Sequence, residues 1–140
     1  MLEYPRNEIF YSGCFLFNPE SKCILLHLRD GNTTVHPNQW AFFGGSSELG
    51  ETPVQCIIRE LKEELELEIN ETQLIFLTSY LNKERNNLRF IFYIISKQSK
   101  SEFVLHEGAD LEWVPIDKLF EYNLTEKTRK DLEFFMSSLT

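Results

Sequence analysis

Residues 45–67 read GSSELGETPVQCIIRELKEELEL, a polar loop that runs into an acidic amphipathic segment. If the part after Thr52 is helical, Glu60, Glu63 and Glu64 stand at positions i, i+3 and i+4 and share one face. Like charges at this spacing repel, so a helix accepts the cluster where water surrounds it or a cation binds it. The cations that prefer carboxylate oxygen are Mg²⁺, Mn²⁺ and Ca²⁺. The segment therefore indicates either a solvated acidic surface or a metal site.

The start of the helix is marked by three residues. Thr52 is a suitable N-cap, Pro53 fits the first helical position, and Gln55 stands where a capping box has its third residue. We expect the helix to run from Pro53 to Leu65. Its apolar stripe lies about a third of a turn from Glu60 and consists of Val54, Ile57, Ile58, Leu61 and Leu65. One side of the helix should pack while another presents acid.

The spacing of the fixed residues resembles the Nudix box: Gly, five residues, Glu, seven residues, Arg-Glu, an aliphatic, any residue, Glu-Glu, any residue, Gly and an aliphatic. The positions here are Gly45, Glu51, Arg59, Glu60, Leu61, Glu63, Glu64, Glu66 and Leu67. Glu66 replaces the last glycine, and Phe43 stands where many relatives carry proline. The chain thus resembles the Nudix hydrolases of MutT type. The resemblance implies the α/β Nudix fold, a mixed β-sheet sandwiched between α-helices, as a single domain over residues 1–140.

The resemblance also implies which residues bind metal. By position, Glu60, Glu63 and Glu64 would carry Mg²⁺, with Mn²⁺ as a substitute, and the carbonyl of Gly45 would join them. Phosphoryl transfer to water requires neutralised phosphate oxygens, a deprotonated water and an in-line arrangement of the two. A carboxylate-bound Mg²⁺ supplies most of these requirements.

Further catalytic roles are implied for residues around the box. Arg59 is the expected ion-pair partner of Glu51 and would orient the glutamates. Glu107, six residues before Trp113, resembles a glutamate that reaches the metal from a mobile loop in MutT-type enzymes. An exposed loop glutamate is the ordinary alternative for this position. Asp110 and Glu112 are the other candidates for the metal-binding glutamate's role. For the general base we favour Glu60, with Glu107 second.

Two residues are candidates for substrate recognition. Arg29, at the end of the second expected strand, stands where relatives often place a basic residue that touches the phosphates. Asn123 resembles in position an asparagine that reads the purine edge in MutT-type enzymes. An exposed arginine and a turn asparagine are the ordinary alternatives for these two positions.

Composition limits the class of protein. The chain has 140 residues, of which 42% are apolar, and a net charge of −8, which argues against direct binding to a nucleic-acid duplex. The three cysteines are odd in number and lack CxxC spacing, so we expect reduced thiols rather than a zinc site or disulfides. Since no signal segment or membrane-length apolar run is present, we expect a cytoplasmic protein that does not bind membranes. We also expect a monomer or a homodimer.

Periodicity predicts the remaining elements. We expect strands at residues 9–17 and 22–29, joined as a hairpin, and at 40–43, 73–81, 88–96 and 111–114. A C-terminal helix over residues 125–139 would pack on the sheet through Leu132, Phe135, Met136 and Leu139.

Together these features predict a hydrolase that cleaves the phosphoanhydride of a nucleoside diphosphate linked to another group. A nucleoside triphosphate that yields the monophosphate and pyrophosphate is the favoured substrate. Nucleotide sugars and dinucleoside polyphosphates are the enzymatic alternatives. A Nudix-like module that binds a nucleotide without turnover is the alternative from another class, although such modules usually lose box glutamates.

Overall fold

The computed structural model describes residues 4, 7–32 and 37–139. Its strands are β1 (Tyr11–Asn18), β2 (Cys23–Leu28), β3 (Trp40–Ala41), β4 (Phe43–Ser46), β5 (Ile75–Asn82), β6 (Asn87–Ile95) and β7 (Asp110–Pro115). Its α-helices are α1 (Pro53–Leu65) and α2 (Glu126–Ser138), and short 3₁₀ helices cover Glu71–Gln73, Lys100–Glu102 and Ile116–Glu121. In this part of the chain no helix is long and apolar enough to span a bilayer.

The strands form one mixed sheet in the order β3-β2-β1-β6-β5. β1 and β6 run parallel, and the other pairs are antiparallel. β1 pairs with β4 over its first half, with Gly13 opposite Gly44, and with β2 over its second half, with Leu16 opposite Leu25. β4 and β2 therefore share one edge of β1, and β4 leads the chain toward α1.

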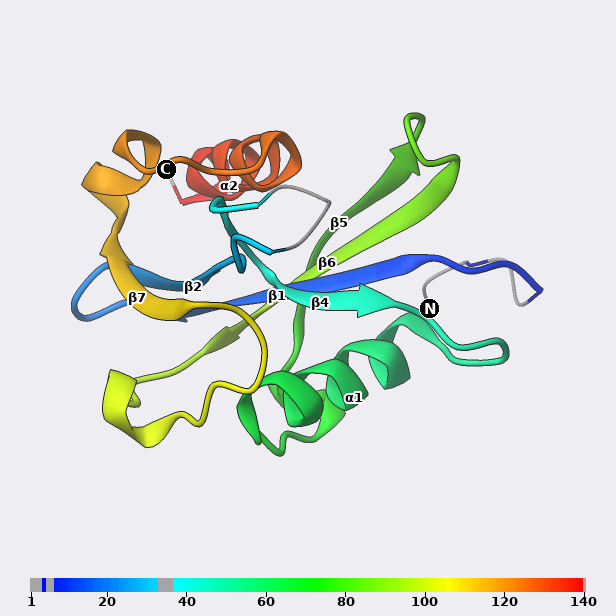
Figure 1. Cartoon of the computed structure of the whole chain (residues 1–140), viewed down its shortest axis with the longest axis horizontal. Helices are drawn as coiled ribbons and strands as arrows, with labels where there is room; N and C mark the ends of the chain where they lie inside the picture. Colours follow the sequence, from blue (N-terminus) through cyan, green and yellow to red (C-terminus); the bar gives the residue numbers. More distant parts are fainter. Residues whose placement is uncertain (1–3, 5–6, 33–36, 140) are drawn as a thin grey trace.

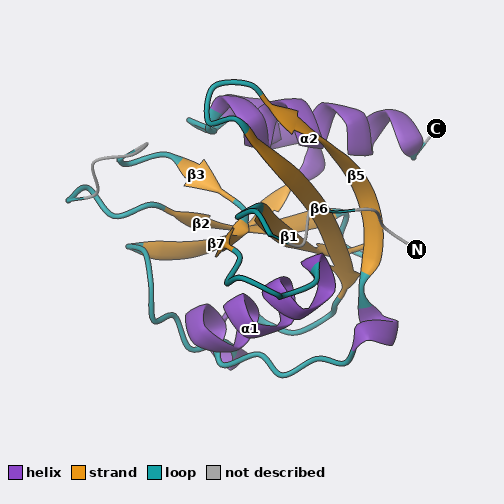
Figure 2. Ribbon diagram, turned by 90° about the vertical axis from the view of Figure 1, so that its right-hand side faces the viewer, coloured by secondary structure: helices purple, strands orange, loops and turns teal. Residues whose placement is uncertain are grey.

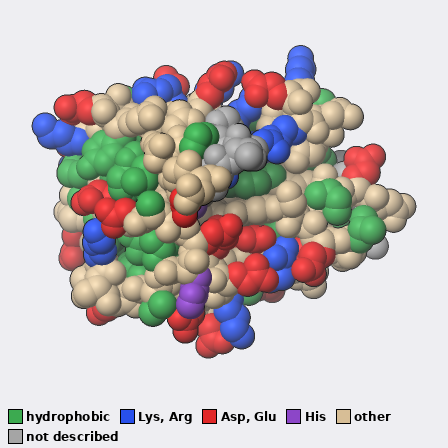
Figure 3. Space-filling view, in the orientation of Figure 1, with side chains coloured by type: hydrophobic (Ala, Val, Ile, Leu, Met, Phe, Trp, Pro, Cys, Tyr) green, Lys and Arg blue, Asp and Glu red, His purple; other side chains and the backbone are tan. Residues whose placement is uncertain are grey.

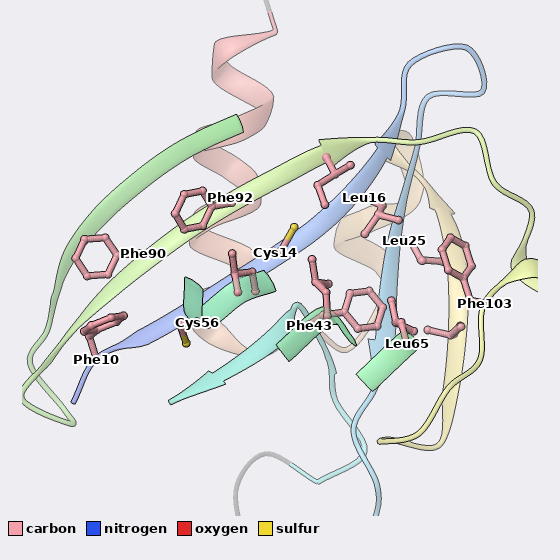
Figure 4. Packing of buried hydrophobic residues seen from close by; sticks show 14 residues of the cluster. Phe10, Cys14, Leu16, Leu25, Phe43, Cys56, Leu65, Phe90, Phe92 and Phe103 are labelled. Carbon is pink, nitrogen blue, oxygen red and sulfur yellow. The ribbon is translucent and has the colours of Figure 1, made fainter. Parts of the chain in front are cut away.

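The two α-helices cover opposite faces of the sheet (Figures 1 and 2). Side chains of β1 alternate between these faces, as strand geometry requires: Cys14 and Leu16 pack in the core beneath α1, whereas Phe15 and Phe17 pack in the core beneath α2. Figure 4 shows the first of these cores. The predicted α/β fold class, a mixed sheet between helices, is thus confirmed.

The box helix has the predicted bounds and start. The N–H of Gln55 donates to Thr52 Oγ1 and the N–H of Thr52 donates to Gln55 Oε1, both at 3.0 Å, which completes the capping box. The helix does not continue past Leu65: Glu66 adopts the left-handed conformation, with φ of 53° and ψ of 29°. It therefore occupies the conformation for which the family pattern has glycine.

Two predicted elements differ in detail. The strand expected at residues 40–43 is divided at Phe42 into β3 and β4, and the glycine pair lies within β4 rather than after a strand. Gly44 has φ of +145°, and a Cβ there would collide with the carbonyl oxygen of Ser12, so the antiparallel pairing of β4 with β1 requires glycine at this position. At the C-terminus, Leu132 and Phe135 are buried as predicted, but Leu139 is 46% exposed because α2 ends at Ser138.

The cysteines agree with the prediction of reduced thiols. All three are free in the structure, with Cys14 and Cys56 buried and Cys23 partly buried. The loop expected before β3 extends in part over residues 33–36, which lie outside the described residues.

Candidate functional site

Arg59 of α1 binds the loop that precedes the helix. Its Nε donates to Glu51 Oε2 at 2.7 Å and its Nη2 donates to Glu51 Oε1 at 3.0 Å. This bidentate interaction favours arginine over lysine. Nη2 also donates to the carbonyl of Ser46 at 3.2 Å. The hydrogen bond from Arg59 is the main cause that holds the pKa of Glu51 below its usual value. The expected Arg59–Glu51 ion pair is therefore present.

Two of the box glutamates are buried between α1 and β4. Glu64 is 3% exposed and Glu60 is 9% exposed. Glu64 Oε2 accepts a hydrogen bond from the N–H of Gly44 at 2.8 Å. The Glu60 carboxylate packs on Gly45, where a Cβ would stand 2.6 Å from Oε1. Since any side chain at position 45 would displace this carboxylate, Gly45 is what lets the acidic helix face approach β4 at Glu60.

Burial raises the pKa of both carboxyl groups. The pKa of Glu64 is raised to about 9, first by burial and then by the negative charges of Glu60 and Glu107. The pKa of Glu60 is also raised, chiefly by burial, although Arg59 opposes the shift. Arg59 Nη1 donates to Glu60 Oε1 at 3.0 Å. Glu64 instead accepts from the Gly44 N–H, so two neighbouring buried carboxylates, of which Arg59 bonds Glu60, make a site that favours an additional cation.

The third box glutamate is oriented differently. The Glu63 side chain is 57% exposed and its Oε2 lies 3.3 Å from Arg59 Nη1. Acidic side chains gather on the surface over α1 (Figure 3). Arg59 Nη1 donates to both Glu60 and Glu63, so the guanidinium holds these two carboxylates. Among the described residues, no three His, Cys, Asp or Glu side chains converge closely enough to hold a metal in this arrangement.

The donors near α1 nevertheless fit a hard divalent cation. They are carboxylate oxygens together with the carbonyl oxygen of Gly45, which faces α1 and lies 3.7 Å from Cys56 Sγ. Oxygen donors of this kind are those that Mg²⁺ and Mn²⁺ select. The assignment of Gly45, Glu60, Glu63 and Glu64 as the metal ligands stays a prediction.

The loop before β7 brings Glu107 to the same place. Glu107 lines a cleft together with Gly44 and Gly45, and its charge helps to raise the pKa of both Glu60 and Glu64. The structure thus brings this sequence-predicted residue close to the box glutamates.

The alternatives to Glu107 are placed elsewhere. Asp110 forms an ion pair with Lys100 Nζ at 3.1 Å, and Glu112 lies on β7 opposite Leu26. Neither is a lining residue of the cleft.

The cleft has a volume of about 340 Å³ and opens beside the glycine pair. Four basic residues from separate parts of the chain line it, namely Arg29, Arg85, Arg89 and Lys127. Arg29 is the residue that the sequence predicted for phosphate contact, whereas the other three were missed. A cleft that places cationic side chains beside the glycine pair, against which the buried glutamates of α1 lie, can bind a polyanion and its counter-cation together.

A buried ion pair fixes the floor of the cleft. Arg89 donates to Asp131 Oδ2 from Nε at 3.1 Å, and its Nη2 lies 3.0 Å from the same oxygen. Tyr80 donates its hydroxyl to Asp131 Oδ1 at 2.8 Å, and the guanidinium carbon lies 4.5 Å from the centroid of the Tyr11 ring. Burial raises the pKa of Tyr11 to about 12. The sequence signal for Arg89 is a charged residue inside the apolar pattern of β6, whereas Asp131 stands in α2 among several other charged residues and gives no such signal.

Asn123 does not reach this cleft. Its Oδ1 accepts from Gln39 Nε2 at 3.3 Å, and its Nδ2 donates to the carbonyl of Asn38 at 3.5 Å. Asn123 is not a lining residue of the cleft. Its role in base recognition stays a prediction that none of these contacts supports.

Comparison with known proteins supplies the family. The model of the NUDIX domain matches residues 11–136. The chain is 29% identical over 129 residues to nucleoside triphosphatase NudI of Escherichia coli O139:H28, an overlap that covers 85% of this chain and 91% of the relative.

Two solved structures share the fold. The MutT protein from Methanosarcina mazei Go1 superimposes with a TM-score of 0.73 at 18% identity and covers 100% of both chains. The NUDIX domain of Shewanella oneidensis NrtR, complexed with ADP ribose, gives a TM-score of 0.73 at 14% identity and covers 99% of this chain and 91% of its own. With the NUDIX match over most of its length, this chain belongs to the Nudix family and is a hydrolase that acts on phosphoanhydrides.

Proposed function

We propose that this protein is a Mg²⁺-dependent hydrolase that cleaves a nucleoside triphosphate into the monophosphate and pyrophosphate. The observation that carries the proposal is the cleft, in which Glu107 and the glycine pair that backs Glu60 and Glu64 share one cavity with four basic residues. The name of the NudI relative, a nucleoside triphosphatase, supports the same substrate class.

The charges of the cleft favour a triphosphate over a shorter anion. Arg29, Arg85 and Lys127 reach the cleft from the end of β2, the β5–β6 turn and α2, respectively. A triphosphate carries more negative charge than the diphosphate of a nucleotide sugar, so it gains more from several cations spread along one cavity. Guanidinium groups also match the geometry of phosphate oxygens.

The acidic side would provide the reactive groups. Glu60, Glu63, Glu64 and the carbonyl of Gly45 would hold Mg²⁺, which when bound neutralises phosphate charge and acidifies water. Arg59 orients Glu60 and Glu63 through its hydrogen bonds to both. Burial raises the pKa of Glu60, which suits its carboxylate to accept a proton from the attacking water. Glu107 is the second candidate for this proton transfer.

A substrate panel tests the proposal. The protein would be incubated with Mg²⁺ and, separately, with each ribo- and deoxynucleoside triphosphate, a nucleotide sugar, ADP-ribose and a dinucleoside polyphosphate, and the products would be separated by anion-exchange chromatography. We expect equal amounts of nucleoside monophosphate and pyrophosphate from triphosphates, and no turnover when EDTA replaces Mg²⁺. Nucleoside diphosphate with orthophosphate, or turnover of nucleotide sugars alone, would contradict the proposal. Binding of a nucleotide without any turnover would support the non-catalytic alternative.

A further inference from the structure

The segment that carries Glu107 is anchored on both sides. The N–H of His106 donates to the carbonyl of Glu64 at 2.8 Å, and the N–H of Ala109 donates to the carbonyl of Leu28 at 2.8 Å. One anchor is the C-terminal turn of α1 and the other is the end of β2. Glu107 therefore lies on a short span between two fixed elements, and its position depends on what supports that span.

His27 of β2 lies directly beneath this span. Its side chain is buried, with the residue 4% exposed, and its ring stacks on Phe43 with centroids 5.0 Å apart. Its Nε2 lies 2.9 Å from the carbonyl oxygen of Phe42. Because a carbonyl oxygen can only accept a hydrogen bond, Nε2 carries a proton. Burial lowers the pKa of His27 to about 4, so the ring is neutral near pH 7 and Nδ1 is left as an acceptor.

The main chain at Gly108 rests against that acceptor. Gly108 has φ of +99°, and a Cβ there would lie 2.8 Å from His27 Nδ1 and 2.8 Å from the carbonyl oxygen of Leu28. Nδ1 is buried and has no hydrogen-bond partner among the residues that the structure describes. Burial is the main cause of the lowered pKa of His27, and the main chain of Glu107 opposes that shift. The loop at Gly108 thus lies on the His27 ring, whose Nδ1 faces the loop as a hydrogen-bond acceptor.

We propose that His27 is a positioning residue that sets the distance between the Glu107 segment and the glycine pair of β4. One ring nitrogen holds Phe42, which leads into Gly44, and the other faces Gly108. Gly44 in turn donates its N–H to Glu64. A single rigid ring therefore supports both segments that bring groups to the box glutamates.

This inference rests on the proposed role of Glu107 in hydrolysis, and its test separates the two. His27→Phe keeps a flat ring against Phe43 but removes both nitrogens. His106→Gln is the matched control, because it changes an exposed histidine of the same loop, whose Nε2 lies 2.6 Å from Glu66 Oε2, and leaves the support beneath the loop intact. Each change would be made in the wild-type protein and in the Glu107→Gln variant, and kcat and KM for the preferred triphosphate would be measured well below the unfolding temperature.

In the wild-type protein, we expect His27→Phe to lower kcat about tenfold and to change KM by less than about twofold. In the Glu107→Gln variant, we expect the same change to lower kcat by less than about twofold. His106→Gln should leave kcat within about twofold of the wild type. Equal losses from His27→Phe in both backgrounds would overturn the inference, since the effect would not pass through Glu107. If Glu107→Gln alone left kcat unchanged, the proposed role of Glu107 would fail instead, and with it the basis of this inference.

Gly108→Ala provides an independent variant if His27→Phe does not fold. The added methyl group would meet the ring at Nδ1 and would occupy a strained left-handed backbone, so it displaces the loop without changing the core beneath it. The same loss of kcat, again absent in the Glu107→Gln background, is expected. Wild-type kcat in a folded Gly108→Ala variant would contradict the inference.

Discussion

Replacing Asp131 by alanine isolates the buried ion pair beneath the cleft. The side chains of Arg89 and Asp131 are 10% and 3% exposed, so Asp131→Ala leaves a guanidinium in the interior without its anion. Breaking a buried pair in this way costs about 3–5 kcal/mol, and the Tyr80 hydroxyl loses its acceptor as well. At about 3 °C per kcal/mol for a chain of this size, the melting temperature should fall by about 9–15 °C.

Urea denaturation followed by circular dichroism would measure this loss. Glu133→Ala, on the exposed side of the same helix, is the control and should change the free energy of unfolding by less than about 0.5 kcal/mol. Replacing both partners, as Arg89→Met with Asp131→Leu, should restore most of the stability, because no unpaired charge remains. A loss of less than about 1 kcal/mol in Asp131→Ala, or a double variant as unstable as the single one, would refute the reasoning.

Two further predictions concern the box. Arg59→Lys should lower the free energy of unfolding by about 1 kcal/mol, because lysine cannot reproduce the two hydrogen bonds to Glu51. Urea denaturation would measure this loss, and unchanged stability would show that a positive charge alone is enough to hold Glu51. Glu66→Gly should raise the free energy of unfolding by up to about 1 kcal/mol, because it relieves a left-handed non-glycine residue and removes only an exposed contact with His106. A lower thermal midpoint for Glu66→Gly would contradict that prediction.

Local signals explain why so much of the fold was predictable. Thr52, Pro53 and Gln55 each act within one helical turn, so the sequence placed the start of α1 correctly. The division of the strand at Phe42 could not be predicted, because β3 pairs with β2 whereas β4 pairs with β1. These pairings join residues far apart in the chain, which periodicity does not report.

The candidate site likewise combines features that the sequence predicted with features that depend on packing. Helical spacing placed Glu60 and Glu64 on one face. The packing of α1 on β4 adds what spacing does not report: Glu60 packs where Gly45 has no side chain, and Glu64 accepts from the main chain of Gly44. The Arg89 network was missed because its partner is 42 residues away in sequence, on another element. Pattern reasoning locates groups along an element, whereas the cleft is built between elements.

The central claim, that the acidic face of α1 holds the catalytic metal, is tested most directly by kcat in Glu63→Gln and Glu64→Gln. Glutamine keeps the size of each side chain and removes its charge, and Glu68→Gln, which alters an exposed glutamate beyond the helix end, is the matched control. With folding verified by circular dichroism and Mg²⁺ at saturation for the wild type, the account predicts a fall in kcat of at least about a hundredfold in both variants and little change in the control. Near-normal kcat in both Glu63→Gln and Glu64→Gln would contradict it.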